Sequence, residues 1–362
     1  MRGNARAVVV LLAVIACTLA ACQAVSGRAV TGTGPEQETA PAALNRENVT
    51  RMEEQENWVV ALGPVLAMAY SPTDDRLATQ GADLIVRVWD TQTGRMMGEL
   101  FEHQRPGWGL AYSPDGRYLL SAGGAVGQDT ILWDVERGEA ISTTSTDGLF
   151  VHDVAWAPDG SQYLVVSSGS SRLYVYETST GIRTQHRPSG ISLSALAHGE
   201  HYLATTNSIG TTYVYNFAGS QVYEQIRMMR YDVNVDRLVE DDVAGRDLEF
   251  SPDESLLANC YLDGMVEIWR TSDWERVSKF EAHQYVNRET LGCVDGVFSA
   301  GGDVYFTGGD DGALRAWDPL TGELLVEWQF PMEVRRVAVS PEGDRLAVGL
   351  ANGVVYFYAL PE

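Results

Sequence analysis

"TGGDDGALRAWDPLTGE", Thr307 to Glu323, carries two adjacent aspartates, then an apolar stretch that ends in Trp-Asp, then a Thr-Gly turn. Two carboxylates beside an aromatic residue fit the acid/base pair of an enzyme. They equally fit the fixed parts of a structural turn. A single copy of the pattern does not distinguish these two interpretations, and the rest of the chain does.

The same pattern recurs about every 40 residues, with longer gaps near 217–250 and 270–298. Each unit has an apolar segment that runs into Ser-Pro or a variant of it. These segments are YSPTDD from Tyr70, YSPDGR from Tyr112, WAPDGS from Trp156, LAHGEH from Leu196, FSPDES from Phe250, FSAGGD from Phe298 and VSPEGD from Val339. A second apolar segment of each unit ends in Trp-Asp or a variant. These ends are Asp90, Asp134, Glu177, Asn216, Arg270, Asp318 and Ala359.

The apolar segments are rich in β-branched and aromatic residues and are bounded by Gly, Asp and Pro, which predicts short strands. Each unit gives four: a before Ser-Pro, b after it, c at Trp-Asp and d after the Thr-Gly turn. No long segment of helical period interrupts them. Four strands in about 40 residues are typical of a β-propeller.

These units resemble the repeats of the WD-repeat family, and the resemblance covers Trp58 to Glu362. It implies an all-β fold, a seven-bladed β-propeller of four-stranded antiparallel blades. The last unit stops after its third strand, and a spare strand, NWVVALG from Asn57, precedes the first unit. In WD-repeat propellers such an N-terminal strand completes the last blade, which leaves no open sheet edge.

The family uses a structural tetrad of His, Ser or Thr, Asp and Trp. The buried Trp N–H donates to the hydroxyl, His bonds the same hydroxyl, and Asp holds the other ring nitrogen. By resemblance the members are His283, Thr307, Asp311 and Trp317 in unit six, His103, Ser121, Asp129 and Trp133 in unit two, and Thr79, Asp83 and Trp89 in unit one. Unit five keeps Asp263 and Trp269, with Asn259 at the Ser/Thr position, and units three, four and seven have Tyr176, Tyr215 and Tyr358 at the Trp position.

Because these sets are distributed one per blade, they do not converge in one pocket, and we interpret them as scaffold. Asp311 is expected to hold a turn, whereas Asp310 has no assigned partner and is expected to be solvated. The chain carries no Gly-x-Ser-x-Gly, His-Glu-x-x-His, phosphate-loop or Cys-x-x-Cys motif. We therefore expect no catalytic residues, no cofactor and no enzyme activity.

The first residues are typical of an export signal. Arg2 and Arg6 precede an apolar run, 7–16, that is too short to span a bilayer. The run leads to Leu19-Ala20-Ala21-Cys22, which resembles the lipobox of bacterial lipoproteins. That resemblance implies a signal peptide over 1–21 and fatty acylation of Cys22. The alternative is an ordinary cleaved signal in which Cys22 is incidental.

Residues 22–56 are rich in Gly, Thr, Pro, Glu and Gln and predict a lipid-anchored flexible tether, with a short helix possible around Ala43 to Glu54. The propeller is expected over 57–362. The anchor would place it in the cell envelope, on the outer side of the cytoplasmic membrane or in the outer membrane. Cys260 and Cys293 could pair there, or each could be a small buried hydrophobe.

The net charge is -23 and Lys279 is the single lysine, so the surface repels phosphate backbones and nucleic-acid binding is not expected. One segment departs from the repeat. There Asp232, Asn234 and Asp236 have the spacing of a calcium loop. Arg237 stands where that loop needs Gly, so we expect a solvated insertion or a partner-binding loop and no metal, with a calcium site as the alternative.

In this family the loops between blades, with the b–c turns, form the narrower top face. Aromatic and arginine residues there are expected to contact a protein or peptide partner. They are Arg105, Trp108, Phe150, Arg187, Met229, Arg230, Tyr231, Tyr285 and Arg288. The expected function is a membrane-anchored, non-catalytic interaction scaffold. The alternatives are an envelope-assembly component, a ligand or calcium sensor, and an enzyme, which three or more acidic or His side chains meeting at the channel mouth would favour.

Overall fold

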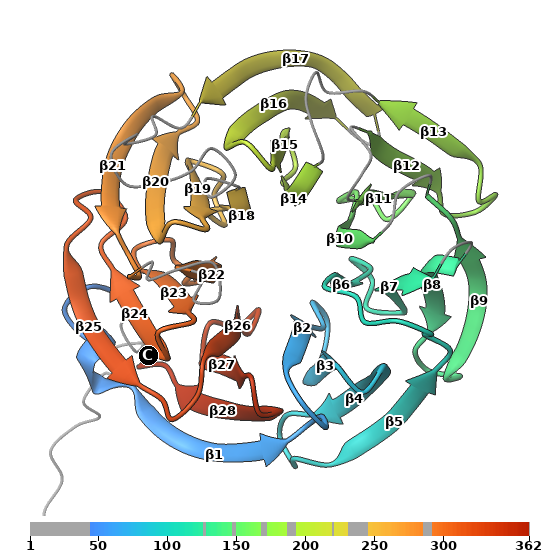
Figure 1. Cartoon of the computed structure of the whole chain (residues 1–362), viewed down its shortest axis with the longest axis horizontal. Helices are drawn as coiled ribbons and strands as arrows, with labels where there is room; N and C mark the ends of the chain where they lie inside the picture. The colour runs from blue at the N-terminus through green and yellow to red at the C-terminus, as the bar shows by residue number, and fades with distance from the viewer. Residues whose placement is uncertain are drawn as a thin grey trace, which may run out of the picture. The chain divides into compact units, whose positions relative to one another are not determined.

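The structure is a computed structural model, and it describes residues 44–125, 128–146, 150–167, 172–186, 193–218, 221–230, 245–284 and 292–361. In this part of the chain the strands form seven four-stranded sheets, in which every strand pairing is antiparallel. Figure 1 shows the sheets arranged around a central channel. The prediction of an all-β, seven-bladed propeller is confirmed.

Each blade runs from an inner strand at the channel to an outer strand at the rim, in chain order except that β1 is the outer strand of blade seven. Blades one to three are β2 (Val65–Tyr70), β3 (Arg76–Gly81), β4 (Ile85–Asp90) and β5 (Met96–Phe101); β6 (Leu110–Tyr112), β7 (Tyr118–Ala125), β8 (Gln128–Asp134) and β9 (Glu139–Thr144); and β10 (Val151–Trp156), β11 (Gln162–Ser167), β12 (Leu173–Glu177) and β13 (Arg183–His186). Blades four and five are β14 (Leu193–His198), β15 (Tyr202–Asn207), β16 (Thr211–Ala218) and β17 (Gln221–Arg230); and β18 (Gly245–Phe250), β19 (Leu256–Tyr261), β20 (Met265–Arg270) and β21 (Glu275–Glu281). Blades six and seven are β22 (Cys293–Phe298), β23 (Tyr305–Gly309), β24 (Ala313–Trp317) and β25 (Leu324–Gln329); and β26 (Val334–Val339), β27 (Arg345–Leu350), β28 (Val354–Ala359) and β1 (Glu53–Val59).

The ring closes through β1, which pairs antiparallel with β28 from Glu53 opposite Ala359 to Val59 opposite Val354. The Trp58 ring lies 4.1 Å from the Phe357 ring and 5.9 Å from the Trp89 ring, so one side chain joins the last blade to the first. The N-terminal strand thus completes the last blade, as the repeat count predicted.

The packed part of the chain begins earlier than residue 57. Residues 44–56 were assigned to the tether, but Leu44, Val49 and Met52 are buried in the core cluster of blades six and seven. The possible helix around Ala43 to Glu54 is only the 3₁₀ turn η1 (Val49–Arg51). The assignment missed this because three apolar residues among polar ones show no period, yet they fill a groove beside β25.

Burial follows the position of a strand within its blade. The second strands β11 and β19 are buried along their whole length, because neighbouring blades cover both faces of the sheet. The outer strand β1 is mostly exposed. The Thr-Gly turns before the outer strands end on glycines with positive φ, 68° at Gly94 and 72° at Gly322, a conformation that favours glycine.

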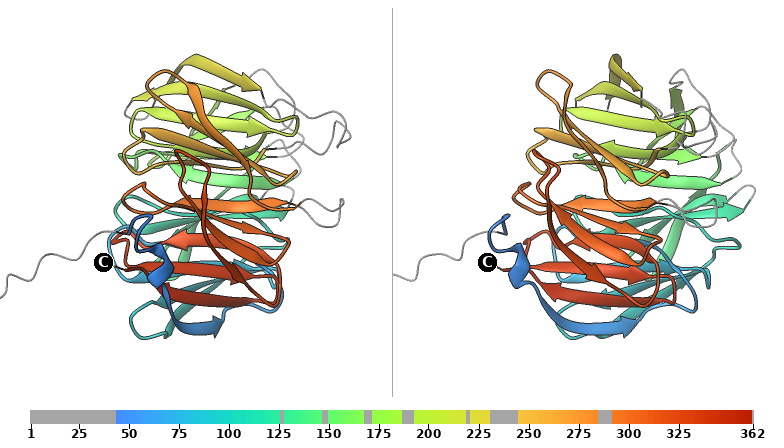
Figure 2. Two further views of the ribbon diagram at one scale, coloured as in Figure 1. Left: turned by 90° about the vertical axis from the view of Figure 1, so that its left-hand side faces the viewer. Right: turned by 60° about the vertical axis from the view of Figure 1, so that its left-hand side comes forward.

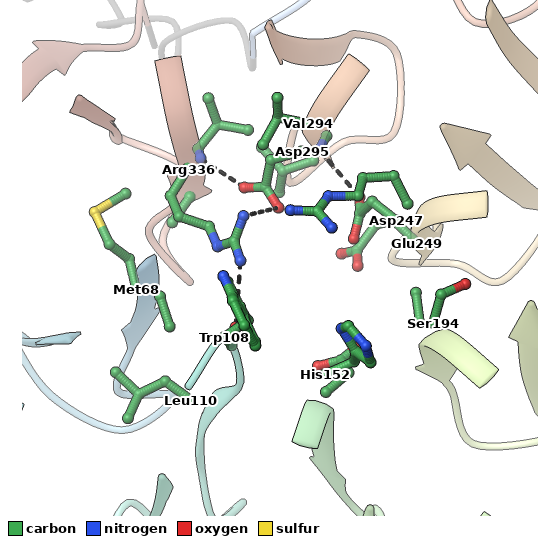
Figure 3. Close-up of a pocket in the computed structure, with 18 of the residues that line it drawn as sticks. Met68, Trp108, Leu110, His152, Ser194, Asp247, Glu249, Val294, Asp295 and Arg336 are labelled. Atoms are coloured by element: carbon green, nitrogen blue, oxygen red, sulfur yellow. Dashed lines mark hydrogen bonds and ion pairs between the residues drawn. The ribbon is translucent and has the colours of Figure 1, made fainter. Parts of the chain in front are cut away.

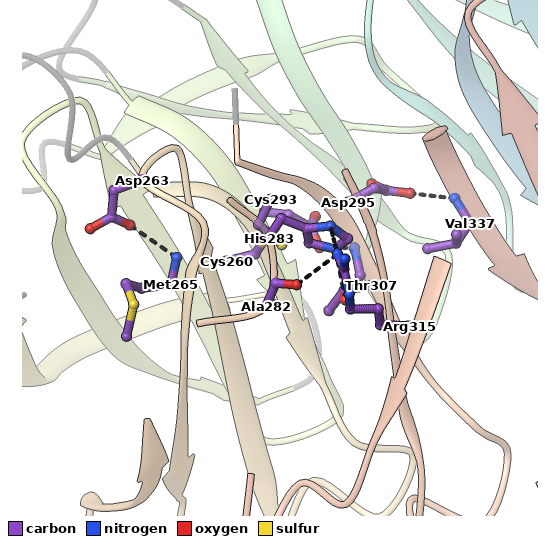
Figure 4. Close-up of a disulfide and its surroundings, with 12 residues drawn as sticks. Cys260, Asp263, Met265, Ala282, His283, Cys293, Asp295, Thr307, Arg315 and Val337 are labelled. Atoms are coloured by element: carbon purple, nitrogen blue, oxygen red, sulfur yellow. Dashed lines mark hydrogen bonds between the residues drawn. A yellow bond between two sulfur atoms is a disulfide. The ribbon is translucent and has the colours of Figure 1, made fainter. Parts of the chain in front are cut away.

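Cys260 of β19 and Cys293 of β22 form a disulfide that links blade five to blade six (Figure 4). Both cysteines are fully buried. Of the two alternatives left open by the sequence, the structure has the pair. The link lies beside His283 and Thr307, so a covalent and a hydrogen-bonded connection lie close together at this blade boundary.

The topology gives the ring two faces. The top face holds the connections between blades and the turn between the second and third strands of each blade. The bottom face holds the other turns. Asn45 to Glu47 lie against bottom-face turns, near Gly301 and Leu320, and Figure 2 shows η1 and the C-terminus at the same edge of the ring. Within the described residues, no helix has the length and apolar character needed to cross a membrane.

Candidate functional site

The tetrad of blade six is complete. Trp317 Nε1 donates to Thr307 Oγ1 at 2.9 Å, and His283 Nε2 lies 2.9 Å from the same oxygen. His283 Nδ1 lies 2.9 Å from Asp311 Oδ1, so the chain of contacts runs from the blade interior to the top-face turn. His283 and Thr307 are buried, and burial lowers the pKa of His283, which keeps the ring neutral at neutral pH.

An arginine that the sequence analysis did not assign completes this network. Arg315 donates to Asp311 Oδ2 at 2.7 Å, to the Ala282 carbonyl at 3.0 Å and to Glu327 at 2.6 Å. Burial alone would raise the pKa of Asp311, but the hydrogen bonds from His283 and Arg315 hold it well below its usual range. Asp311 is therefore a permanent anion at the centre of a cationic turn.

The other two predicted tetrads are partial versions of the same network. In blade two Trp133 donates to Ser121 at 2.7 Å and His103 lies 2.6 Å from it; the side chain of Asp129 lies outside the described residues. In blade one Trp89 donates to Thr79 at 3.0 Å. That blade has no His, and Arg87 instead joins Asp83 to the Val60 carbonyl. Arg87 and Arg315 both stand two residues before the Trp, which is the sequence signal that identifies them.

In blade five, Asn259 stands at the Ser or Thr position of the tetrad and makes different contacts. Asn259 donates to Thr212 Oγ1 of blade four at 2.6 Å and to the Tyr261 hydroxyl at 2.9 Å, rather than to its own Trp269. Glu267, fully buried, lies 2.6 Å from Arg276. This arrangement bridges the strands of blades four and five, whereas the tetrad ties strands of blade six to the connection that precedes them. In blade three Tyr176, at the Trp position, donates to the Ser145 carbonyl.

Asp310 corrects one expectation. It was expected to be solvated and without a partner, but its side chain is only 4% exposed and Oδ1 lies 2.9 Å from Nη1 of Arg335. The partner comes from the top of β26 in the next blade. The sequence could not show this, because the two residues belong to different repeats and meet only when blade six packs against blade seven.

The inner strands surround a cavity of about 250 Å³ in the channel (Figure 3). One side of it is apolar, with Met68 and Leu110, and the opposite side is charged. The charged and aromatic lining residues are Trp108, His152, Asp153, Arg246, Asp247, Glu249, Asp295 and Arg336. The carboxylates and the histidine do meet here, which is the arrangement that would favour an enzyme. None of these residues except Trp108 was singled out from the sequence.

Three of the four carboxylates have structural contacts. Asp153, Asp247 and Asp295 each accept a backbone N–H of the next inner strand, from Leu196 at 3.1 Å, Gly296 at 3.0 Å and Val337 at 2.7 Å. An inner strand has a free edge at the channel, so its N–H groups need acceptors. Each carboxylate therefore joins neighbouring blades.

Burial is the main cause of the pKa shifts among the residues that line the cavity. It raises the pKa of Asp153 to about 7 and that of Glu249 to about 8, where Asp295 and Asp153 add to the effect. It also raises the pKa of Asp247, and it lowers the pKa of His152 to about 4. At neutral pH Glu249 holds its proton and the histidine is neutral.

The structure describes three of the predicted partner-contacting side chains. Arg105 and Phe150 are exposed on the top face. Trp108 is half-buried at the channel mouth, stacked on His152 with ring centroids 5.6 Å apart and edge-on to Phe150 at 6.0 Å. Arg187, Tyr231, Tyr285, Arg288 and the side chains of Met229 and Arg230 lie outside the described residues, as do Cys22 and the suggested calcium ligands Asp232, Asn234 and Asp236. No cluster of potential metal ligands occurs among the residues that are described.

A sequence signal for the channel residues does exist. Asp153, Asp247, Asp295 and Arg336 each stand four residues before the Ser, or its Ala substitute, that begins the Ser-Pro turn. A charged residue at one phase of an otherwise apolar inner strand marks the position that faces the channel. The signal was missed because a single charged residue in a strand fits the usual alternation of polar and apolar residues. It stands out only when the inner strands of all the blades are aligned.

Comparison with known proteins agrees with this geometry. The family model described as "WD domain, G-beta repeat" matches residues 60–90, 240–270 and 274–318. Over 298 residues, 78% of this chain and 53% of the relative, the chain is 24% identical to the WD repeat-containing protein WDS homolog of Arabidopsis thaliana. These matches support a WD-repeat family for the chain.

Two further relatives match shorter stretches. Protein groucho of Drosophila melanogaster is 32% identical over 108 residues, which are 30% of this chain and 14% of the relative. Eukaryotic translation initiation factor 3 subunit I of Scheffersomyces stipitis is 33% identical over 99 residues, 27% of each chain. The chain thus spans about half the length of the WDS homolog and a smaller share of the other two.

Proposed function

We propose that this WD-repeat propeller is a protein-interaction scaffold whose top face receives the partner. The supporting observation is the distribution of exposed apolar side chains on that face. Leu62, Phe150 and Met332 lie in connections between blades and Ile209 in the turn between β15 and β16, and each is more than a third exposed. The charged channel mouth lies on the same face, and apolar anchors together with polar groups are common at interfaces.

The partner-binding test compares one exposed apolar residue on each face. Phe150→Ser changes the top face, and Leu320→Ser, in the bottom-face turn after β24, is the matched control. Both wild-type side chains are exposed, so neither change should lower the melting temperature appreciably. In capture experiments from detergent-solubilised envelopes, we expect Phe150→Ser to lose the partner and Leu320→Ser to retain it. The opposite pattern would move the binding face to the bottom.

We further propose that the propeller is held at the cell envelope by a lipid on Cys22. The support is the export signal, the four-residue box before the cysteine and the polar stretch after it. The buried Cys260–Cys293 disulfide also suits an oxidising compartment outside the cytoplasm. Asn45 to Glu47, near the start of the described chain, lie on the bottom face.

Mass spectrometry of the mature N-terminus tests the anchor. We expect a diacylated Cys22, and we expect Cys22→Ala to release the protein from the membrane fraction into the soluble fraction. Stable anchoring needs more than one acyl chain, so partial acylation would weaken membrane retention. An unmodified Cys22 on membrane-bound protein would contradict the lipoprotein proposal while leaving the scaffold proposal untouched.

A second candidate function is catalysis in the channel by a lyase or hydrolase. The observation that favours it is Glu249, whose pKa of about 8 suits a general acid or base at neutral pH and which has no hydrogen-bonding partner among the described residues. Envelope extracts incubated with the wild-type protein and with Glu249→Gln test this candidate. A product that forms with the wild type and not with the variant would support catalysis over display.

A further inference from the structure

Arg246 is a cation at the channel mouth. It is the bulged residue of β18, where the pairing with β19 skips from Gly245 to Asp247, and its side chain lines the cavity. Among the described residues no acceptor lies within hydrogen-bond or ion-pair distance of its guanidinium. A guanidinium removed from water without an acceptor is costly, so this group calls for an anion.

Two more arginines lie close to it. Burial first, and then repulsion from Arg336 and Arg335, lowers the pKa of Arg246 to about 10, although attraction from Asp310 and Asp295 acts in the opposite direction. Arg336 lines the same cavity and donates to the backbone carbonyls of Arg335 and Trp108, while its distance to Asp295 is 3.8 Å. Like charges gathered around one cavity are stable only when something compensates them.

The neighbouring acids do not supply that compensation fully. Asp153, Asp247 and Asp295 are engaged with backbone N–H groups of the next blade. Glu249, three residues beyond Arg246 on β18, holds its proton up to about pH 8 and is then a donor rather than an anion. At neutral pH the cavity therefore offers guanidinium and carboxylic acid donors together, and both bind carboxylate oxygens.

We propose that the channel mouth is a binding site for a carboxylate group, seated between Arg246 and Arg336. The planar carboxylate matches the fork of a guanidinium. A cavity of about 250 Å³ holds one acidic side chain or chain terminus rather than a large cofactor. The stacked pair Trp108 and His152 gives the aliphatic part of the ligand an apolar wall. If the carboxylate belongs to a protein partner, this site rests on the proposed scaffold function. A free small organic acid carries the same group and is the other possible source of the ligand.

Titration calorimetry on the full chain tests the site with four probes: succinate, an acetyl-triglutamyl amide peptide, inorganic phosphate and arginine amide. We expect saturable binding of the carboxylate probes and weaker binding of phosphate and of arginine amide. Arg246→Gln should weaken carboxylate binding about tenfold or more, because it removes a charge-assisted hydrogen bond. Arg137→Gln, in an exposed bottom-face turn, is the matched control and should bind as the wild type does.

The pH dependence gives an independent readout. Between about pH 6.5 and about 8.5 the carboxyl groups of Asp153 and Glu249 ionise. Asp247, Asp295, His152, Arg246 and Arg336 complete the titratable lining. Negative charge therefore accumulates, and carboxylate affinity should fall as the pH rises. A cation site would show the opposite slope.

The outcomes separate this site from the scaffold. Tighter binding of the peptide than of succinate assigns the carboxylate to a partner chain, and the reverse assigns it to a free acid. The site is overturned if no carboxylate binds saturably, if phosphate or arginine amide binds more tightly, or if a folded Arg246→Gln binds like the wild type. None of these results contradicts the proposal that the top face captures the partner, since that proposal is tested separately with Phe150→Ser. Loss of top-face capture, in turn, leaves succinate binding intact.

Discussion

Asp310 and Asp311 are adjacent in the chain, but their side chains contact different parts of the ring. Asp311 closes a network within blade six, with His283 and Arg315, while Asp310 pairs with Arg335 across the boundary to blade seven. Neither is free to act as an acid or a base, because both carboxylates are neutralised by arginine. The contacts of Asp311 hold the turn between β23 and β24, and the pair of Asp310 with Arg335 joins blade six to blade seven.

Replacing Asp311 should therefore cost stability and leave binding unchanged. Asp311→Ala leaves Arg315 and His283 without their acceptor, and we expect a loss of about 2–4 kcal/mol in the free energy of unfolding. Denaturant titration measures it. Asp273→Ala, an exposed aspartate in the turn before β21, is the control with little change expected. Loss of partner capture at an unchanged melting temperature would show that Asp311 acts in recognition instead.

The channel carboxyls predict a pH dependence of stability. Asp153 and Glu249 hold protons in the folded protein up to about pH 7 and 8, whereas the unfolded chain releases them near pH 4. The folded state binds more protons over that interval, so the free energy of unfolding falls as the pH rises. Buried His103 and His152, with pKa lowered to about 4, act in the opposite direction, but only below about pH 6.5.

Scanning calorimetry from about pH 6.5 to about 8.5 isolates the carboxyl contribution. We expect the melting temperature of the wild type to fall across this range, and we expect Glu249→Gln to show a smaller fall because one of the titrating groups is gone. Arg137→Gln should follow the wild type. A melting temperature that rises with pH would contradict the assignment of protonated acids to the channel.

At the scale of the strands, the chain before residue 57 is part of the fold. A chain that begins at residue 44 keeps η1, β1 and the buried side chains of Leu44, Val49 and Met52. A chain that begins at residue 57 loses most of β1 and exposes an edge of β28. We expect the first to melt like the full chain and the second to melt at a clearly lower temperature or to aggregate. Equal melting temperatures would show that the blade closes without β1.

The disulfide joins two blades at fully buried positions. Cys260→Ser with Cys293→Ser removes a cross-link over 33 residues, and we expect a loss of about 2–4 kcal/mol in the free energy of unfolding. The measurement is denaturant titration of the wild type with and without reductant, beside the double variant. If the wild type is equally stable in reductant, the link does not form in solution.

Strand count, blade order and ring closure were predictable because each repeat carries its own turn chemistry: Ser-Pro before β3 and β7, Thr-Gly before β25. The tetrad residues were predictable by resemblance, since they sit within one repeat or just before it. Contacts between repeats were not. Asp310 with Arg335, Asn259 with Thr212 and the channel lining all join residues of different blades, whose proximity depends on how the blades pack rather than on local pattern.

At the scale of the whole molecule, the two faces differ in chemistry. The bottom face holds the N-terminal segment through Arg46, which lies 2.8 Å from Asp318 and 3.0 Å from Glu323. The top face holds the tetrad turns, the apolar residues around the channel and the unpaired Arg246. This difference between the faces supports the proposal that the top face receives the partner.

The central claim is that the partner sits on the top face around the channel mouth. Hydrogen exchange of the propeller with and without its captured partner tests it directly. We predict slower exchange on partner binding at Gly107 to Leu110 and at Phe150 to Asp153, with exchange unchanged in the bottom-face turn from Pro319 to Gly322. Protection confined to that bottom turn, or to the outer strands β5 and β25, would contradict the account.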